Sequence, residues 1–296
     1  MKKKIFVLLL IFISFFEAKA VNSEWVSFYL MIPDFNVKFD FIKQYDKNKI
    51  WFTNNCNSYK SVNNVIKWYG YEFSSTYDLE IDRTLFVWKV ESKLGSGIEK
   101  RNSNDSVIKA YGHSDTTFPS GSYWSVAVDS LNNKWFGLDS GLMKYNDTSW
   151  SLIKTKDKIA HICANKKNEI WAVFDINFKY SYIGRFDGKN WSYFDSTQTG
   201  ISRSGFNIHI NSDSQNRIWI RSDSFISFFD GTWHQIINIA KNLLDADGIC
   251  IKNDVVWLGG KGILLKLENG LSSGINMPSF AGERIYTIGI DADNNK

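Results

Sequence analysis

This sequence of 296 residues has few residues that can cross-link the chain or interrupt secondary structure: it contains three cysteines and three prolines. Cys56, Cys163 and Cys250 cannot all pair within one chain, and a chain of this length can bury a core without disulfides. We therefore exclude a disulfide framework and expect three small buried side chains. A Cys163–Cys250 bond is disfavoured because the repeat described below sets these residues two units apart, beyond the reach of a disulfide.

Long apolar runs are also scarce. Residues 5–16 form one such run, between a lysine cluster at residues 2–4 and the small-residue pattern Ala18-Lys19-Ala20. The run is shorter than the roughly 20 residues of a membrane-spanning helix, and the arrangement is typical of a secretory signal peptide. An uncleaved anchor is the alternative. We expect residues 1–20 to be removed and the chain from Val21 to be periplasmic, cell-surface or secreted, with no transmembrane segment.

Excess charge is missing once this leader is set aside. The formal net charge of the whole chain is +4, and the leader contributes three of these charges, which leaves +1 for the mature chain. No basic cluster interleaved with aromatic residues occurs, so we expect no nucleic-acid partner. The sequence also shows no phosphate-binding glycine loop, nucleophile elbow or metalloprotease helix, so we expect no cofactor and no catalytic residues.

Aromatic residues, in contrast, are abundant, and tryptophan marks an internal repeat. Six tryptophans in equivalent contexts follow one another at intervals of 36 to 48 residues. A period of this size indicates a repeat architecture. We call them the motif tryptophans: Trp51, Trp88, Trp135, Trp171, Trp219 and Trp257.

Each repeat reads as four short strands. An alternating apolar stretch is followed by a polar turn, the motif tryptophan strand, a third strand, and a fourth strand that often opens with tryptophan, as at Trp150, Trp191 and Trp233. Period-two alternation between Gly, Asn and Asp turns is typical of antiparallel hairpins. Four strands per unit, repeated, predict an all-β fold, a β-propeller of four-stranded antiparallel blades, with the motif tryptophans filling the wedges between blades.

The repeat count predicts a single propeller domain over residues 21–296, seven-bladed with the last blade incomplete. Strand-like residues near Trp25 would close the ring against the C-terminal stretch, in which two strands of the seventh blade are missing, as expected if the reading frame continues beyond Lys296. Six blades are the alternative. The expected repeats are 33–75, 76–118, 119–158, 159–201, 202–240, 241–277 and a partial unit 278–296 with 24–32.

The repeat motif resembles the two-component regulator propeller repeat. The pattern Asp-x-x-x-Asn-x-Trp-x-Gly followed by Gly-Leu-x-x-Tyr and a further Trp is clearest between Asp129 and Trp150, and it recurs in weaker form around Trp171, Trp219 and Trp257. The units around Trp51 and Trp88 depart further. The resemblance implies an extracytoplasmic sensor-type propeller, of the kind found in bacterial membrane-bound regulators that respond to carbohydrates. The sandwich domain, membrane span and kinase of those regulators are not in this sequence.

Residues on the predicted inner strands are the first candidates for a site. His161 and His209 occupy equivalent positions in successive repeats, four residues before the turn residues Asn165 and Asp213. They could line the central channel, with Cys163 on the same face of its strand. A zinc site needs three or four converging ligands, so we expect channel-wall packing and no metal. Turn aspartates are expected to bind turn amides, because they recur at one repeat position: Asp129, Asp187, Asp213, Asp230 and Asp291.

Residues that depart from the repeat are better candidates for ligand binding. We expect them in loops over segments 111–124, 180–185 and 197–206, because binding residues concentrate in loops. The predicted ligand-binding residues are Tyr111, His113, Tyr123, Trp124, His161, Tyr180, Tyr182, Arg203 and His209.

Three functions fit these features. A sensor-like module that binds a carbohydrate, a peptide or a protein partner is favoured, because the repeat is regular and no catalytic constellation is visible. A structural or assembly protein of the cell envelope is the second. A lyase or hydrolase with its site around His161 and His209 is the third.

Overall fold

The computed structural model describes most of residues 41–276, together with Ile288. The described segments are 41–46, 49–54, 57–62, 65–71, 76–91, 97–104, 106–112, 118–119, 121–176, 180–201, 208–222, 225–236, 249–252, 254–260, 263–268, 271–276 and 288. The predicted signal peptide, Trp25, Cys56, Asp291 and most of the predicted partial repeat lie outside these residues.

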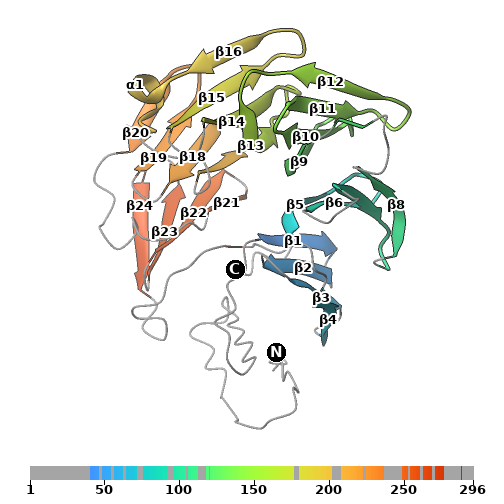
Figure 1. Cartoon of the computed structure of the whole chain (residues 1–296). Helices are drawn as coiled ribbons and strands as arrows, with labels where there is room; N and C mark the ends of the chain where they lie inside the picture. The colour runs from blue at the N-terminus through green and yellow to red at the C-terminus, as the bar shows by residue number, and fades with distance from the viewer. Residues whose placement is uncertain are drawn as a thin grey trace.

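In the described part of the chain, the strands form six four-stranded antiparallel sheets, each built from consecutive strands (Figure 1). Sheet I contains β1 (Phe41–Asp46), β2 (Lys49–Asn54), β3 (Asn57–Val62) and β4 (Val65–Tyr71). Sheet II contains β5 (Thr76–Ile81), β6 (Val87–Glu91), β7 (Ile98–Arg101) and β8 (Val107–Tyr111). Sheet III contains β9 (Tyr123–Val128), β10 (Lys134–Leu138), β11 (Gly141–Tyr145) and β12 (Trp150–Lys154).

Sheet IV contains β13 (Lys158–Ala164), β14 (Ile170–Ile176), β15 (Tyr180–Phe186) and β16 (Trp191–Phe194). Sheet V contains β17 (His209–Ser212), β18 (Ile218–Ser222), β19 (Phe225–Phe229) and β20 (Trp233–Ile236). Sheet VI contains β21 (Ile249–Lys252), β22 (Val255–Gly259), β23 (Ile263–Glu268) and β24 (Leu271–Asn276). A single helical turn, α1 (Ser196–Thr199), follows β16 and is capped by Asp195. The expected all-β fold of four-stranded antiparallel units is confirmed.

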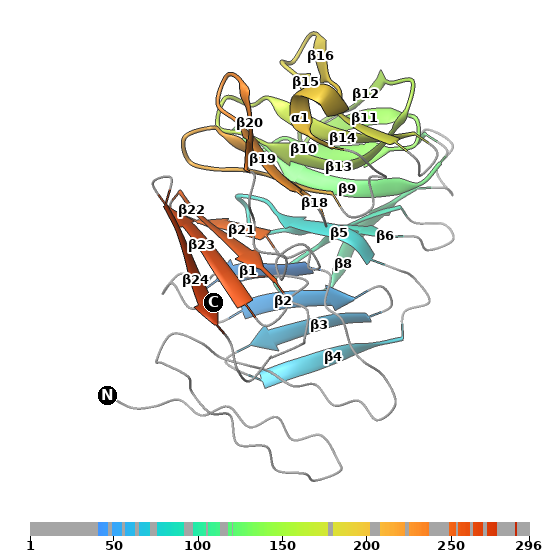
Figure 2. The same ribbon diagram turned by 90° about the vertical axis from the view of Figure 1, so that its left-hand side faces the viewer.

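The first strands of the sheets define the inside of the arrangement. Strands β1, β5, β9, β13, β17 and β21 each contact the next in this order. The sheets therefore fan around a common axis, which Figures 1 and 2 show from two directions. Ile288 is buried against Trp257 and Leu264 of sheet VI. The number of blades stays a prediction.

All six motif tryptophans lie in the second strand of their sheet. Each pairs with the first strand at the same register, opposite Lys43, Glu80, Ala127, Cys163, Asn211 and Cys250 in chain order. Cys163 and Cys250 therefore occupy the same register position in their sheets, opposite a motif tryptophan. Both cysteines are free thiols; Cys163 is buried and Cys250 is half-buried.

The core lies between sheets. Trp88 of sheet II packs with Phe136 and Met143 of sheet III, and its ring centroid is 6.0 Å from that of Phe136. Trp171 of sheet IV packs in the same way against sheet V, with its ring 4.9 Å from Phe229. Trp88 and Trp171 thus each fill the space before the next sheet. Burying one such side chain contributes on the order of 2–3 kcal/mol of stability.

Turn aspartates anchor these tryptophans. Asp129 Oδ1 accepts hydrogen bonds from the backbone amides of Leu131 and Asn133, and its Oδ2 accepts from Trp135 Nε1 at 2.9 Å. Asp187 accepts from the amides of Lys189 and Asn190 in its own turn. The carboxylates therefore stabilise turn backbone, because short polar side chains satisfy amides that a tight turn leaves unpaired.

One segment expected as a loop, 180–185, is strand, and in the described structure the ends of segment 111–124 also lie in strands. Tyr180–Phe186 forms β15 and pairs with β14 without interruption from Ile170 to Ile176. Tyr111 ends β8, and Tyr123 begins β9. The expectation was wrong because the insertion lengthens the β14–β15 hairpin, and the extra residues stay in the ladder where their backbone groups are paired.

Candidate functional site

The inner wall of the sheets brings together the two histidines predicted to be equivalent. His161 lies on β13 and His209 on β17, and their ring centroids are 6.1 Å apart. Both side chains are partly exposed. Ser125, the equivalent residue on β9, is buried, with its hydroxyl unpaired among the described residues. The equivalent Thr287 lies outside the described residues.

A pocket opens where the first strands end. It has a volume of about 560 Å³ and is lined by the ends of β5, β9, β13, β17 and β21 with the turns that follow them. We call it the axial pocket. Asp129 and Asp213 line it but direct carboxylate oxygens to their own turns and tryptophans. The other charged side chains at the pocket are Glu80, Arg83, Lys166 and Lys252.

Trp124 lies at the opposite end of the same strands. Its ring is 4.8 Å from that of Tyr77 on β5, and the ammonium group of Lys158 on β13 lies 4.4 Å from its centroid. Its Nε1 donates to Asp139 at 2.6 Å. A half-buried ring held between three sheets can stack on a flat ligand, and a cation over its face adds an electrostatic contribution.

Two predicted ligand residues are buried instead of facing solvent. Tyr111 is 6% exposed and its ring lies 5.0 Å from that of Trp150 of sheet III; Tyr123 is 1% exposed. Burial raises the pKa of the Tyr111 phenol. Their surface placement was wrong because aromatic rings at these positions fill the wedge between sheets II and III.

Tyr182 is a strand residue with a packed ring. It stacks on Phe174 at 4.8 Å, and its hydroxyl donates to Asp157 Oδ2 at 2.9 Å. Burial, with the Asp157 carboxylate, raises the pKa of Tyr182. Tyr180 begins the same strand. His113 and Arg203 lie outside the described residues. A ligand-binding role for any of these residues stays a prediction.

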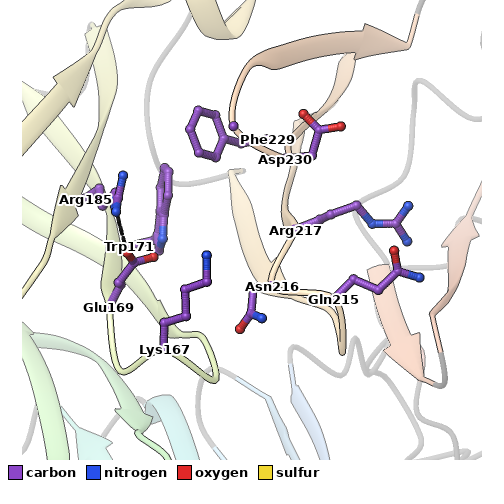
Figure 3. A pocket seen from close by; sticks show the side chains of 10 residues that line it. Lys167, Glu169, Trp171, Arg185, Gln215, Asn216, Arg217, Phe229 and Asp230 are labelled. Carbon is purple, nitrogen blue, oxygen red and sulfur yellow. Dashed lines mark hydrogen bonds and ion pairs between the residues drawn. The ribbon is translucent and has the colours of Figure 1, made fainter.

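A second pocket separates sheets IV and V, and we call it the inter-sheet pocket (Figure 3). Its volume is about 480 Å³. Residues 167–171 and Arg185 form one side, and residues 215–217 with the β19–β20 turn form the other. The sequence analysis predicted neither this pocket nor the charged side chains at the axial pocket. One residue in the sequence could have pointed to the inter-sheet pocket: Asn165 is an amide where the neighbouring repeats have Asp129 and Asp213.

The described residues were also searched for metal and membrane features. Within them, no group of three or more His, Cys, Asp or Glu side chains could hold a metal ion. None of the described helices has the length and hydrophobicity needed to cross a bilayer.

Sequence comparisons find no match: no family model matches the chain, and no curated protein matches it. Solved structures do match. Two are structures of the extracellular domain of the B. thetaiotaomicron protein BT4673, assigned as a hybrid two-component system in one and as a one-component system in the other. They superpose with TM-scores of 0.63 and 0.58 at 15% identity, over 86% of this chain and 36% of theirs.

A third structure is YCF48 bound to a D1 peptide. It matches with a TM-score of 0.59 at 13% identity, over 84% of this chain and 85% of its own length. The chain therefore spans about a third of the BT4673 extracellular domain and most of YCF48. At these identities the likeness shows the fold: the chain is an all-β propeller of the kind found in the extracellular domain of BT4673, as its repeat motif predicted.

Proposed function

We propose that this protein is an exported, sensor-like propeller that binds a ligand or a protein partner at its axial pocket. The observation that carries the proposal is the convergence of five sheets on that one pocket. Ligand sites favour concave surfaces with a few well-placed polar groups, and a site built from several elements is held rigidly.

The structural neighbours support this proposal in two ways. One is the extracellular part of a regulator, and another is a propeller with a bound peptide. Cationic Arg83, Lys166 and Lys252 at the pocket favour an acidic oligosaccharide or an acidic peptide segment. A role in the periplasm, at the cell surface or in the medium follows from the predicted signal peptide.

A binding screen tests the proposal. The full chain is applied to arrays of acidic oligosaccharides and acidic peptides, and the variant Lys166→Glu/Lys252→Glu is compared with it. The matched control is Lys154→Glu/Lys189→Glu, which reverses two exposed charges away from the pocket. We expect at least a tenfold loss of affinity in the pocket variant only. Equal binding by both variants, or no binding by the unaltered chain, would refute the axial site.

Catalysis is the competing function, and the His161–His209 pair is the feature that favours it. The proposal takes these histidines as part of the inner wall and not as acid–base catalysts. The full chain is assayed for lyase and hydrolase activity, together with His161→Ala and His209→Ala. An activity of the full chain that both variants lack would refute the proposal of a binding function and favour catalysis.

A further inference from the structure

Two hydrogen bonds of the repeat are both missing at the boundary between sheets IV and V. The first joins the motif tryptophan to the turn aspartate. Trp88 Nε1 donates to Asp82 Oδ2 at 2.8 Å, and the equivalent bond is 2.9 Å long in two other sheets. In sheet IV the acceptor position is held by Asn165.

Asn165 cannot accept this bond in its observed orientation. Its Oδ1 accepts from the backbone amides of Lys167 and Glu169, both at 3.0 Å, and its Nδ2 donates to Glu169 Oε2 at 2.7 Å. A flipped amide would point its NH2 group at two backbone donors. The Trp171 side chain is 1% exposed, and its Nε1 has no acceptor in the described part of the chain.

The second repeated bond links the turns of neighbouring sheets. In the turns of sheets III and VI, a left-handed Asn or Asp accepts from the turn of the preceding sheet: Asn132 Oδ1 from Arg83 N at 2.9 Å, and Asp254 Oδ1 from Ser214 N at 3.1 Å. Ser130 Oγ likewise donates to Asn168 Oδ1.

Between sheets IV and V the corresponding residues are Lys166 and Asn216. No hydrogen bond joins them in the described structure, and Asn216 Oδ1 is buried without a donor.

Both orphaned groups line the inter-sheet pocket. Trp171 contributes an unpaired donor from sheet IV, and Asn216 contributes an unpaired acceptor from a turn of sheet V. Figure 3 shows the two residues on different sides of the pocket. A buried polar group left unpaired costs about 1–3 kcal/mol. A molecule that forms hydrogen bonds with both unpaired groups therefore gains affinity by removing both costs. In sheets II, III and V the motif tryptophan has an acceptor in its own turn, so the unpaired indole distinguishes this boundary from theirs.

The charges around the recess favour an anion. Arg185 is paired with Glu169, Arg217 with Asp213, and Asp230 with His234. Lys167 lines the same pocket, and among the described residues no carboxylate forms an ion pair with it. In Figure 3 its side chain extends toward Trp171 across the floor of the pocket.

We propose that the inter-sheet pocket binds a small carboxylate that carries a neighbouring hydroxyl or amino donor. Its carboxylate accepts from Trp171 Nε1 and pairs with Lys167, and its donor group is accepted by Asn216 Oδ1. Sugar acids and free amino acids both have this chemistry. This site is separate from the axial pocket and does not depend on binding there.

Indole NMR tests the proposal directly. The full chain, labelled with ¹⁵N at tryptophan Nε1, is titrated with glucuronate and L-alanine, which carry both groups, and with acetate and glucose, which each carry one kind. The Trp171 resonance is assigned by its loss in Trp171→Phe. We expect it to shift with glucuronate, alanine or both, at concentrations at least tenfold below those needed for acetate and glucose.

The two active probes distinguish a sugar acid from an amino acid as the source of the carboxylate. The proposal is overturned if neither glucuronate nor L-alanine shifts the Trp171 resonance. It is also overturned if acetate and glucose act at concentrations less than tenfold higher.

A variant that restores the repeat provides the second test, although it also removes the Glu169 partner of Arg185. Asn165→Asp/Glu169→Asn reproduces the residues Asp129 and Asn133 of sheet III and leaves the net charge unchanged. In this variant Trp171 Nε1 gains an acceptor within its own sheet. We expect the titration shift to weaken at least tenfold and the melting temperature not to fall.

Lys167→Gln should also weaken binding tenfold, and the exposed Lys156→Gln is its matched control. The axial variant Lys166→Glu/Lys252→Glu should keep the shift. An unchanged titration in Asn165→Asp/Glu169→Asn would refute the role of Trp171.

Discussion

At the scale of single residues, the turn aspartate of sheets II, III and V combines two tasks. One oxygen of Asp129 holds the turn amides, and the other accepts from the buried Trp135 indole, so one side chain couples turn conformation to core packing. Asn165 shows that an amide can hold the turn but not the indole. The difference of one acceptor atom decides whether the motif tryptophan is satisfied.

Replacement of Asp129 by Asn is therefore expected to destabilise the protein. The amide keeps the turn, but it leaves Trp135 Nε1 buried without an acceptor, which costs about 1–3 kcal/mol. Urea unfolding followed by tryptophan fluorescence measures the loss. Asp187→Asn is the matched control, because Asp187 binds only the amides of an exposed turn and touches no buried indole. Equal midpoints for Asp129→Asn and the unaltered chain would contradict the coupling.

Cys163 gives a second residue-scale prediction. Burial between sheets IV and V raises the pKa of its thiol, so the reactive thiolate is rare at pH 8. Cys250 occupies the same register in sheet VI but is only half-buried. We expect iodoacetamide to label Cys250 at least tenfold faster than Cys163 in the folded chain, and both at similar rates in urea. Peptide mass spectrometry measures both rates, and equal labelling in the folded chain would contradict the burial of Cys163.

At the scale of elements, a buried ion pair joins sheets II and III. Lys134 of β10 is fully buried. Its Nζ lies 3.4 Å from Asp82 Oδ2 of sheet II and 2.5 Å from Oδ1 of the half-exposed Asp147. Burial opposes ionisation of Asp82, but hydrogen bonds from Thr84, Trp88 and Phe86, with Lys134, outweigh it and lower the pKa of this carboxyl. An ionised Asp82 thus stabilises the junction above its ordinary pKa of 3.8.

The pH dependence of the unfolding free energy should differ between Asp82→Asn and the unaltered chain. At pH 7 the variant should lose about 3 kcal/mol, because Lys134 and Trp88 each lose a buried carboxylate partner. A lowered pKa means that the contribution is lost as pH falls below 3.8 through the folded-state value. The unfolding free energies of the two proteins should therefore converge as the pH falls below 3.8. Chemical denaturation at each pH measures the difference, and a constant difference would contradict the assignment.

Strands were readable from the sequence wherever alternation was bounded by turn residues. The motif tryptophans were found from local period alone, so their place on the second strand of each unit followed from spacing. Tyr111 and Tyr123 were misplaced because burial between two sheets is a tertiary property that an aromatic residue next to an insertion does not reveal. The substitution of Asn165 was visible, but its consequence depends on Glu169 and on the facing turn of sheet V.

At the scale of the whole molecule, stability comes from contacts between sheets more than from any sheet alone. The four largest hydrophobic clusters of the described residues each contain residues of two successive sheets, as with Trp135 of sheet III and Ile159 of sheet IV. The second strands β6 and β10 are buried along their length, whereas β12 and β16 alternate between partial and full exposure. Within sheets III and IV, burial is therefore greatest in the second strand and least in the fourth.

Hydrogen exchange should report this gradient. Strands β9 and β12 are the two edges of sheet III, and within the described structure each is hydrogen-bonded to one neighbouring strand. They differ in what covers them: β9 lies between β5 and β13, while β12 is largely exposed. Local opening is easiest where few apolar contacts are lost. We expect the paired amides of β9 to exchange at least tenfold more slowly than those of β12.

The same comparison applies between β13 and β16 of sheet IV, which are also the two edges of one sheet. Mass spectrometry of peptides covering each strand measures both pairs. Because the number of ladder partners is matched, slower exchange in β9 and β13 can come only from their cover by adjacent first strands. Equal rates at the inner and outer edges would mean that each sheet opens as an independent unit, and the axial pocket would then lack the rigid wall that the proposed binding requires.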